Sequence, residues 1–320
     1  MPDDSLAAAA RTAVRQCLAL SPEESLVVVT DDEREPIGSA LYHAGLDVTD
    51  DVTMVRYPPG AEHGEEPPAA VAAAMKHADA FLAPTSKSLS HTRARGDASE
   101  AGVRGATLPG ITEAVFTAGL DADYDAIAAE CEAMLEQVAD AEEIRVTSPS
   151  GTDITFRPGD REWFADTGVI HEAGEFGNLP AGEVFVAPED ANGTYVVDGT
   201  ISPHGLLDEG HTVSVTVEDG RVTHIDDDAF RESVEAAAEK GGDGAYNLAE
   251  LGIGTNTAVT ELVGSVLLDE KAGGTVHIAI GDDVGLGGDT DAAIHADGII
   301  RDPTVVADGV EVELPRVDRD

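Results

Sequence analysis

Short apolar runs alternate with alanine-rich segments along the first part of the chain. The runs at 25–32, 51–58 and 80–84 have the length and β-branched content of strands, and the spacing of apolar positions over 4–20, 36–44 and 68–77 predicts helices. Strands and helices in alternation are typical of an open parallel sheet with helices on its faces. A longer amphipathic pattern over 121–141 predicts a helix that closes this region.

Beyond residue 141 the pattern changes to alternating strands punctuated by glycine. Residues 144–158 and 211–225 each predict a β-hairpin, with turns at Ser150-Gly151 and Asp219-Gly220. A short helix is expected over 230–240. The sequence therefore predicts an α/β protein with two domains: an open parallel α/β domain over 1–140 and a β-rich α+β domain over 141–320.

Acidic residues dominate the charge of the chain. It has 63 Asp and Glu against 19 Lys and Arg, a formal net charge of -44, and the acids are dispersed. Such a surface repels itself in dilute buffer and is tolerated when concentrated salt screens it, which predicts a halophilic cytoplasmic protein. The charge argues against binding to nucleic acid or to an anionic membrane. No secretory signal or spanning segment is expected, and Cys17 and Cys131 read as small buried residues.

Residues 275–297 carry the clearest candidate chemistry. His277 lies in the middle of an apolar run, and a loop of glycine and aspartate separates it from the doublet His295-x-Asp297. Imidazole and carboxylate are the usual protein donors for catalytic zinc, manganese, cobalt or iron. A core histidine beside a surface loop is the alternative reading of His277 alone.

Two glutamates extend this candidate site. Glu183 follows a Pro-Ala-Gly corner at the start of an apolar strand, and Glu250 lies in an apolar setting before a glycine-rich turn. Burial of an unpaired carboxylate is costly, so Glu250 needs a proton, a cation or a metal. Five donors with a bridging carboxylate suit a pair of ions about 3.5 to 4 Å apart, which favours hydrolytic chemistry. The candidate metal ligands are Glu183, Glu250, His277, His295 and Asp297.

At these residues the sequence resembles the aminopeptidase T and aminopeptidase S metallopeptidases. The similarity lies in NLPAGEVFVAP, NLAELGIGTN, LDEKAGGTVHIAIG and IHADGII, in that order, across the second domain. The resemblance implies a dimeric exopeptidase that removes N-terminal residues from peptides and uses two cobalt, zinc or magnesium ions. It places metal ligands at the five residues above, with Glu250 as the bridge and Glu183 and Glu250 as the catalytic acids.

One departure from that family keeps a second reading open. Longer members carry a tyrosine soon after the first ligand histidine, and residues 281–288 contain none. An iron-dependent, ring-cleaving dioxygenase of dihydroxypyridine shares the histidine and the HxD doublet and needs one metal ion. This dioxygenase, with iron as its cofactor, is the alternative function.

Other polar residues are weaker candidates. His91 and its neighbours Arg93 and Arg95 could hold a substrate carboxylate or form structural ion pairs. His171, Glu172 and Glu175 could supply a general base. Three further histidines are expected at surface or strand positions: His204, His211 and His224.

Overall fold

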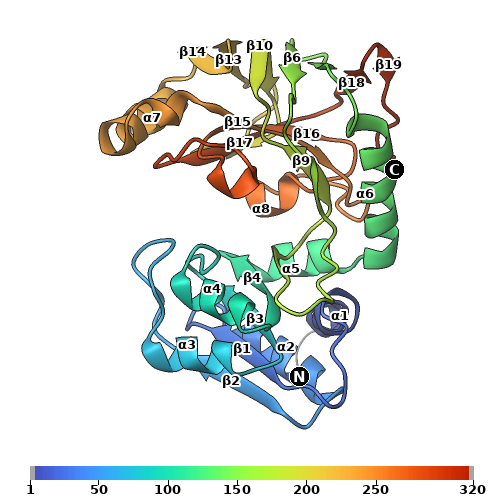
Figure 1. Ribbon diagram of the computed structural model, residues 1–320, viewed down its shortest axis with the longest axis vertical. Coiled ribbons are helices and arrows are strands. Elements are labelled where there is room, and N and C mark those ends of the chain that lie inside the picture. The colour runs from blue at the N-terminus through green and yellow to red at the C-terminus, as the bar shows by residue number, and fades with distance from the viewer. Residues whose placement is uncertain (1–3, 317–320) are drawn as a thin grey trace. The chain divides into compact units, whose positions relative to one another are not determined.

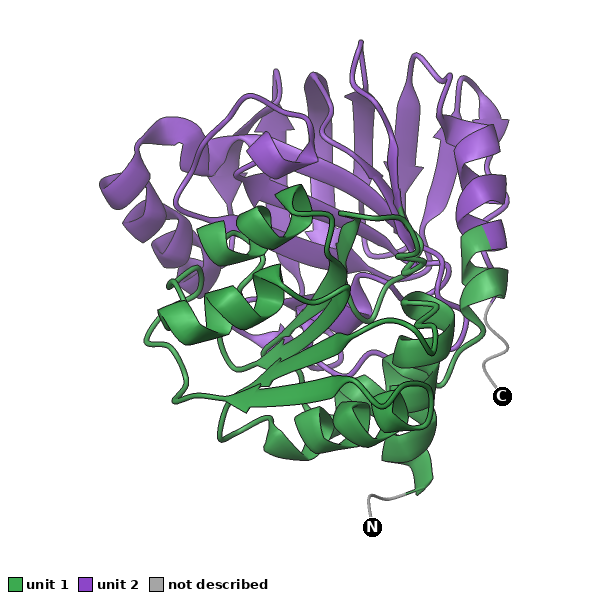
Figure 2. Cartoon of the chain, turned by 60° about the horizontal axis from the view of Figure 1, so that its bottom comes forward, with its two compact units in different colours: residues 1–128, 166–181 green, residues 129–165, 182–320 purple. Residues whose placement is uncertain are grey.

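The computed structural model describes residues 4–316 and divides into two compact units. Unit 1 comprises residues 1–128 and 166–181, and unit 2 comprises residues 129–165 and 182–320 (Figure 2). The chain passes from one unit to the other within the long helix α6, Tyr124–Val138. The sequence-based division at residues 140 and 141 stays a prediction.

Unit 1 is built on a five-stranded parallel sheet with strand order β2-β1-β3-β4-β8 (Figure 1). Its first three strands and the helices between them match the sequence pattern. Its fifth strand comes from the segment 166–181, which returns to this unit after the first hairpin of unit 2. The elements of unit 1 are α1 (Asp4–Thr12), the π-helix η1 (Ala13–Cys17), β1 (Leu26–Thr30), α2 (Glu35–Leu46), β2 (Val52–Arg56), α3 (Ala69–Lys76), β3 (Ala80–Thr85), α4 (Arg93–Glu100), β4 (Arg104–Pro109), α5 (Glu113–Leu120) and β8 (Phe176–Asn178).

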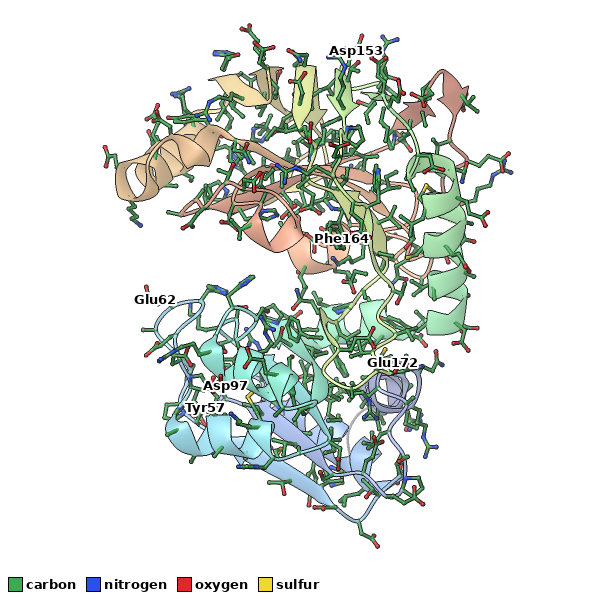
Figure 3. All side chains as sticks on the ribbon, viewed as in Figure 1. Tyr57, Glu62, Asp97, Asp153, Phe164 and Glu172 are labelled. Carbon is green, nitrogen blue, oxygen red and sulfur yellow. The ribbon has the colours of Figure 1, made fainter. Side chains whose placement is uncertain are left out.

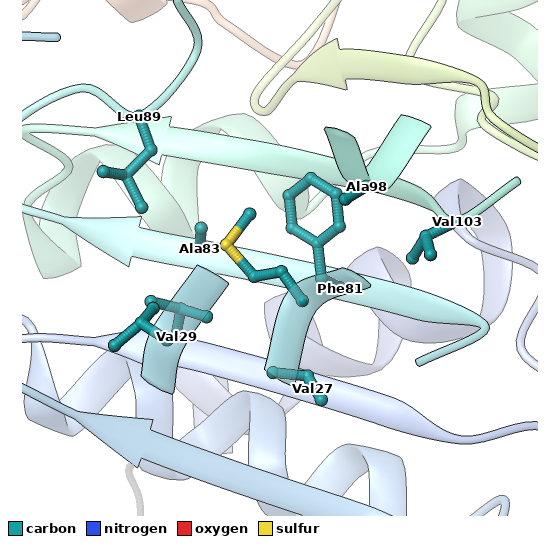
Figure 4. Packing of buried hydrophobic residues seen from close by; sticks show 9 residues of the cluster. Val27, Val29, Phe81, Ala83, Leu89, Ala98 and Val103 are labelled. Carbon is teal, nitrogen blue, oxygen red and sulfur yellow. The ribbon is translucent and has the colours of Figure 1, made fainter. Parts of the chain in front are cut away.

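An apolar cluster fastens helices onto one face of this sheet. Val27 and Val29 alternate along β1, as Phe81 and Ala83 do along β3 (Figure 4). Val71 and Met75 of α3 belong to the same buried cluster. Gly105 on β4 leaves the space that the Phe81 ring fills. Each large side chain removed from water here contributes roughly 1.5 to 3 kcal/mol.

Unit 2 contains two antiparallel sheets of seven strands each. Their orders are β14-β13-β10-β6-β5-β18-β19 and β12-β11-β17-β16-β15-β9-β7. Both hairpins predicted from the sequence are present. The elements are β5 (Ile144–Thr147), β6 (Asp153–Arg157), β7 (Phe164–Asp166), β9 (Glu183–Val186), β10 (Asp190–Val197), β11 (Thr200–Ile201), β12 (Gly205–Leu206), β13 (Val213–Glu218), β14 (Arg221–Ile225), α7 (Asp228–Gly241), η2 (Asp243–Tyr246), β15 (Leu248–Gly254), α8 (Val266–Asp269), β16 (Val276–Gly281), η3 (Val284–Leu286), β17 (His295–Ile300), β18 (Thr304–Ala307) and β19 (Val310–Glu311).

The predicted fold class is confirmed: an open parallel α/β unit accompanies a β-rich unit. Cys17 and Cys131 are buried, as expected. Among residues 4–316, no helix combines the length and apolar character that crossing a bilayer requires.

Candidate metal centre

Four adjacent strands of the second sheet in unit 2 carry the five candidate ligands. Glu183 lies on β9, Glu250 on β15, His277 on β16, and His295 and Asp297 on β17, and these strands are neighbours in the order β17-β16-β15-β9 (Figure 1). Residues paired directly across neighbouring strands project to the same face of a sheet, and so do alternate residues along one strand. The cross-strand pairs that fix this face are Glu183 with Gly254, Gly252 with His277, Glu250 with Ala279, Ala279 with Asp297, and Gly281 with His295. All five candidate ligands therefore project from one face.

A β-bulge in β15 lies just before Glu250. From Glu250 to Ile253 the register with β16 is regular, so Glu250 and Gly252 share the face of His277. Leu248 pairs with Ile280, yet Glu250 pairs with Ala279, so one extra residue is inserted between them. The bulge therefore turns Leu248 to the opposite face, because a one-residue shift exchanges the two faces of a strand.

A small residue opposite His277 makes room for its ring. A side chain at Gly252 would overlap the imidazole of His277, because the two residues are paired across β15 and β16. The ring of His277 is 1% exposed and lies over the glycine. The face thus alternates between small residues and potential ligands.

The ligand atoms converge at hydrogen-bonding distances. The Nε2 atom of His277 is 3.2 Å from Oε2 of Glu183 and 3.3 Å from Oε1 of Glu250, and Nε2 of His295 is 3.1 Å from Oε2 of Glu250 and 3.5 Å from Oδ1 of Asp297. Glu250 therefore lies between the two imidazoles. Two triplets, each with ligand atoms within 4.8 Å of one another, share it: Glu183, Glu250, His277 and Glu250, His295, Asp297.

These contacts shift the protonation of the histidines and of Glu250. Burial alone would lower the pKa of His277, but the facing carboxylates of Glu250 and Glu183 raise it to about 9. The pKa of His295 is also raised, because Asp297 and Glu250 outweigh its desolvation. Burial acts to raise the pKa of Glu250, yet hydrogen bonds from His277 and His295 hold it well below its usual range. The carboxylates thus favour positive charge at this position. Without a metal ion, the protonated imidazoles provide that charge.

The orientation of His295 suits a metal ligand. Its Nδ1 atom lies 2.7 Å from the carbonyl oxygen of Asp282, which can only accept, so Nδ1 carries the proton. The lone pair of the neutral ring then lies on Nε2, the atom that faces Glu250 and Asp297. A backbone carbonyl behind a ligating imidazole is a common device for fixing its tautomer.

Lys271 is a functional candidate that sequence reasoning missed. Its ammonium group contacts Oε1 of Glu183 and lies 2.9 Å from Oε1 of Glu270, and its side chain is 4% exposed. Burial raises the pKa of Glu270 to about 8, although Lys271 acts to lower it. The scarcity of lysine in an acidic chain, together with the position of Lys271 six residues before His277, was the signal available.

The loop between the two histidines is held in place by polar contacts within unit 2. The carboxylate of Asp283 accepts from the backbone amide of Thr290 at 2.6 Å and from the side chain of Asn247 at 2.8 Å. Arg161 donates to the carbonyl oxygen of Gly287 and forms a 2.8 Å ion pair with Asp289. This is the loop that lacks the tyrosine expected by analogy with the peptidases.

An aromatic pair accompanies the cluster. Phe185 is two residues beyond Glu183 on β9 and pairs with Gly252, so it shares the face of the candidate ligands. Phe164 of β7 stacks on Phe185 with ring centroids 5.7 Å apart and is 38% exposed (Figure 3). A face with two imidazoles, carboxylates and a partly open aromatic pair can hold a cation and a flat ring.

The weaker candidates of segments 91–95 and 171–175 belong to unit 1, where Arg93, Arg95 and His171 have partners. Arg93 pairs with Glu66 at 3.3 Å, and Arg95 lies 4.5 Å from the centroid of the Phe176 ring. The Nε2 atom of His171 lies 2.7 Å from the carbonyl oxygen of Gln16 and forms a hydrogen bond with it. These contacts favour the structural alternative for the arginines and give His171 a structural role.

The fold and the cluster define a two-unit α/β protein with a candidate metal centre on an antiparallel sheet. The chain belongs to the family described as 2,5-dihydroxypyridine 5,6-dioxygenase (NicX), whose model matches residues 5–314. A solved structure described as 2,5-dihydroxypyridine dioxygenase from Pseudomonas putida KT2440 matches with a TM-score of 0.79 and 18% identity, covering 100% of this chain and 99% of that chain. Wild-type AmpT from Thermus thermophilus matches with a TM-score of 0.67 and 20% identity, covering 95% and 94%. No curated protein sequence matches the chain.

These matches correct the functional prediction made from the sequence. The family match over nearly the whole chain overturns the prediction of a hydrolase that removes N-terminal residues from peptides, and it supports the dioxygenase, which was the alternative prediction. The resemblance to aminopeptidase T extends to the fold of AmpT and no further. The family match gives no support to a pair of cobalt, zinc or magnesium ions, whereas donor groups for metal binding are present.

Proposed function

We propose that this protein is a ring-cleaving dioxygenase that acts on a dihydroxylated nitrogen heterocycle with one ferrous ion. The observation that supports this most directly is the convergence of His277 and His295 with Glu250 and Asp297 on one sheet face. Two imidazoles and one carboxylate, with further positions open, are the donor set typical of non-haem iron oxygenases. Iron bound there would supply the activation of dioxygen.

The donor set fits a single ion of this kind. The imidazoles of His277 and His295 would supply both nitrogen ligands through Nε2, and either Asp297 or Glu250 would supply the carboxylate. The Nε2 atom of His295 already faces both of these acids. Because protons on the imidazoles now stabilise the acids, an ion of charge two can replace those protons without rearranging the strands.

The charge of the cluster also favours one ion. The carboxylates of Glu183, Glu250 and Asp297 carry three negative charges. The ammonium group of Lys271 compensates one of these charges through its ion pair with Glu183. Glu270, with a pKa raised to about 8, is mostly protonated at neutral pH. One divalent ion therefore brings this group close to neutrality, whereas two would leave an excess of positive charge in a buried place.

The protein side chains around this ion can bind and orient a flat aromatic ring. Phe185 and Phe164 offer an apolar, stacked surface beside the ligands. The Oε2 atom of Glu183 is buried and, although it lies 3.2 Å from Nε2 of His277, it accepts no hydrogen bond from residues 4–316, so it can accept the proton of a ring hydroxyl. Lys271 holds the other oxygen of the same carboxylate and keeps Oε2 directed at the cluster.

The test is turnover by protein of defined metal content. Protein stripped of metal and reloaded anaerobically with ferrous ion in about 2 M KCl should bind one iron per chain. On exposure to oxygen and 2,5-dihydroxypyridine it should consume one dioxygen per ring opened, with loss of the ring absorbance. His277→Ala should abolish iron binding and oxygen uptake, whereas His224→Gln, a change at an exposed histidine on β14, should leave both unchanged. Failure of the one-iron protein to consume oxygen with this or any other dihydroxylated ring would refute the proposal.

A further inference from the structure

A second group of metal-binding side chains lies in unit 2, away from the four strands described above. His204 in the turn between β11 and β12, His211 in the connection that leads to β13, and Asp227 immediately before α7 place three ligand atoms within 4.8 Å of one another. Both histidines were predicted to lie at ordinary surface or strand positions. None of the three residues takes part in the proposed dioxygenase chemistry.

Each residue is held in place by the backbone around it. Asp227 caps α7, because its Oδ1 atom accepts from the amide of Phe230 at 2.8 Å. The preceding residue, Asp226, accepts from the amide of Ser214 at 2.7 Å, which attaches this segment to β13. The connection bearing His211 is anchored where the amide of Leu207 donates to Gly199 at 2.9 Å. The three side chains are therefore brought together by ordered segments of the chain.

The spacing around Asp227 leaves a place for an ion. His204 lies 2.9 Å from Oδ1 through its Nε2 atom, whereas Nε2 of His211 lies 3.7 Å from Oδ2, too far for a hydrogen bond. Two bonds of about 2.0 to 2.2 Å to one tetrahedral zinc place their donor atoms roughly 3.4 Å apart. The gap between His211 and Asp227 is close to that separation. The two imidazoles are also neighbours, with ring centroids 5.2 Å apart and planes inclined at 78°.

We propose that His204, His211 and Asp227 form a second metal site that takes a borderline divalent ion such as zinc. Two imidazoles and one carboxylate exclude the hard ions calcium and magnesium, which prefer oxygen donors alone. Three protein ligands leave a coordination position for water, and the side chains are 24%, 44% and 14% exposed, so an ion can enter from solvent. The ion would fasten the turn after β11 and the connection before β13 to the start of α7.

This site differs from an ion pair in its response to salt. Attraction between exposed charges is screened to within about 3 Å or less in molar salt. Coordination by neutral imidazole survives such screening because it is a direct bond to the metal. In a chain with a net charge of -44, this makes a nitrogen-rich site a salt-resistant connection.

The experiment is calorimetric titration with zinc chloride in about 2 M KCl. The protein is the metal-free full chain carrying His277→Ala and His295→Ala, which removes the other cluster. One zinc per chain should bind, and His204→Gln, His211→Gln or Asp227→Asn added to this background should each weaken binding at least tenfold. Asparagine also caps helices well, so Asp227→Asn tests the ligand without removing the cap. His224→Gln is the matched control and should leave binding unchanged.

A second measurement tests the site without the His277→Ala and His295→Ala changes, in case the protein that carries them does not fold. Zinc content after dialysis is compared between the unaltered protein and the double variant His204→Gln/His211→Gln. The double variant should retain one zinc fewer per chain, and its iron-dependent oxygen uptake should be unchanged. Equal zinc content in these two proteins, or unweakened titration in the three single variants, would overturn the proposal. A lower zinc content with normal oxygen uptake in the double variant supports this site independently of the dioxygenase assignment. Loss of oxygen uptake in the His277→Ala protein tests only the dioxygenase assignment.

Discussion

Gly252 lies directly opposite His277 across β15 and β16, and the imidazole fills the space that a side chain at position 252 would need. The same glycine pairs with Phe185 on its other side. One residue without a side chain therefore sets the position of a candidate ligand and adjoins the aromatic pair.

Replacement of this glycine should weaken metal binding although all the candidate ligands are retained. Gly252→Ala is expected to displace the ring of His277 and to weaken iron binding by about 10- to 100-fold, comparable to the loss of a supporting contact. Overpacking should also destabilise the protein by roughly 1 to 3 kcal/mol. Competition with a chelator gives the affinity, and urea unfolding gives the stability.

Gly285→Ala is the control for this change. A methyl group at position 285 meets no atom within 4 Å, so iron affinity should be unchanged and stability should shift by less than about 0.5 kcal/mol. Equal iron affinity in the Gly252→Ala and Gly285→Ala proteins would show that the ring of His277 is not held by this glycine.

The sequence singled out His277 and Glu250 because each lies in an apolar run, and His295 and Asp297 because they form an HxD doublet. His277 and Glu250 interrupt strands of otherwise apolar residues, where a polar side chain needs a partner. The pattern could not reveal the register of β15 and β16, which places Glu250 and His277 on one face, nor the bulge just before Glu250, because both depend on how two separate strands pair. Lys271 was missed for a similar reason: its partner Glu183 is 88 residues away.

Most of the parallel sheet could also be predicted, because local periodicity defines β1, β2 and β3. The strand β8 could not, since three residues carry little pattern and its partner β4 lies far back in the chain. The prediction of a peptidase was wrong because the resemblance rested on the segments that carry the ligands. The histidine and the HxD doublet in those segments are shared with the dioxygenase, so they could not separate the two functions. Phe185 lies within one of those segments, NLPAGEVFVAP, whereas its stacking partner Phe164 lies outside them and was not part of the comparison.

Phe164 should affect substrate binding more than iron binding. Phe164→Ala removes the exposed ring of the stacked pair but leaves Phe185 and the candidate ligands in place. The KM for a dihydroxylated ring is expected to rise about tenfold, since aromatic stacking contributes about 0.5 to 1.5 kcal/mol beyond the area buried, while iron content stays at one per chain. Steady-state oxygen uptake with parallel iron analysis checks both. An unchanged KM would exclude Phe164 from the ring-binding surface.

Acid should weaken unit 1 through Glu24. Both oxygens of this carboxylate accept from the buried guanidinium of Arg104, at 2.7 and 2.8 Å, and these hydrogen bonds lower the pKa of Glu24 to about 2 although burial opposes them. Because the folded-state pKa lies below the unfolded value of about 4.5, the stabilisation is present above pH 4.5 and is lost as the pH falls towards 2. Glu24→Gln should therefore cost about 2 kcal/mol at pH 7, and the difference should vanish near pH 2.

Thermal unfolding from pH 7 to pH 3 in about 2 M KCl measures this effect. Asp153→Asn serves as the control, because the pair of Asp153 with Arg145 is similar in geometry but exposed, and salt screens it (Figure 3). The pH dependence of that variant should follow the unaltered protein. A constant difference between the Glu24→Gln and unaltered proteins over this range would contradict the assignment.

Lys271 should support the fold and restrain metal affinity at the same time. Lys271→Met leaves the buried carboxylate of Glu183 without its cation, and removal of one partner of a buried pair typically costs about 3 to 5 kcal/mol. Lys271→Met/Glu183→Gln should recover part of this loss, because the uncompensated charge is gone. Iron affinity should rise in the single variant, since one more negative charge then faces the ion, and should fall back in the double variant. Urea unfolding of metal-free protein and chelator competition measure the two quantities, with Lys240→Met on the exposed end of α7 as the control. If Lys271→Met proved as stable as Lys240→Met and bound iron no more tightly, the ion pair would have no part in setting the charge of the site.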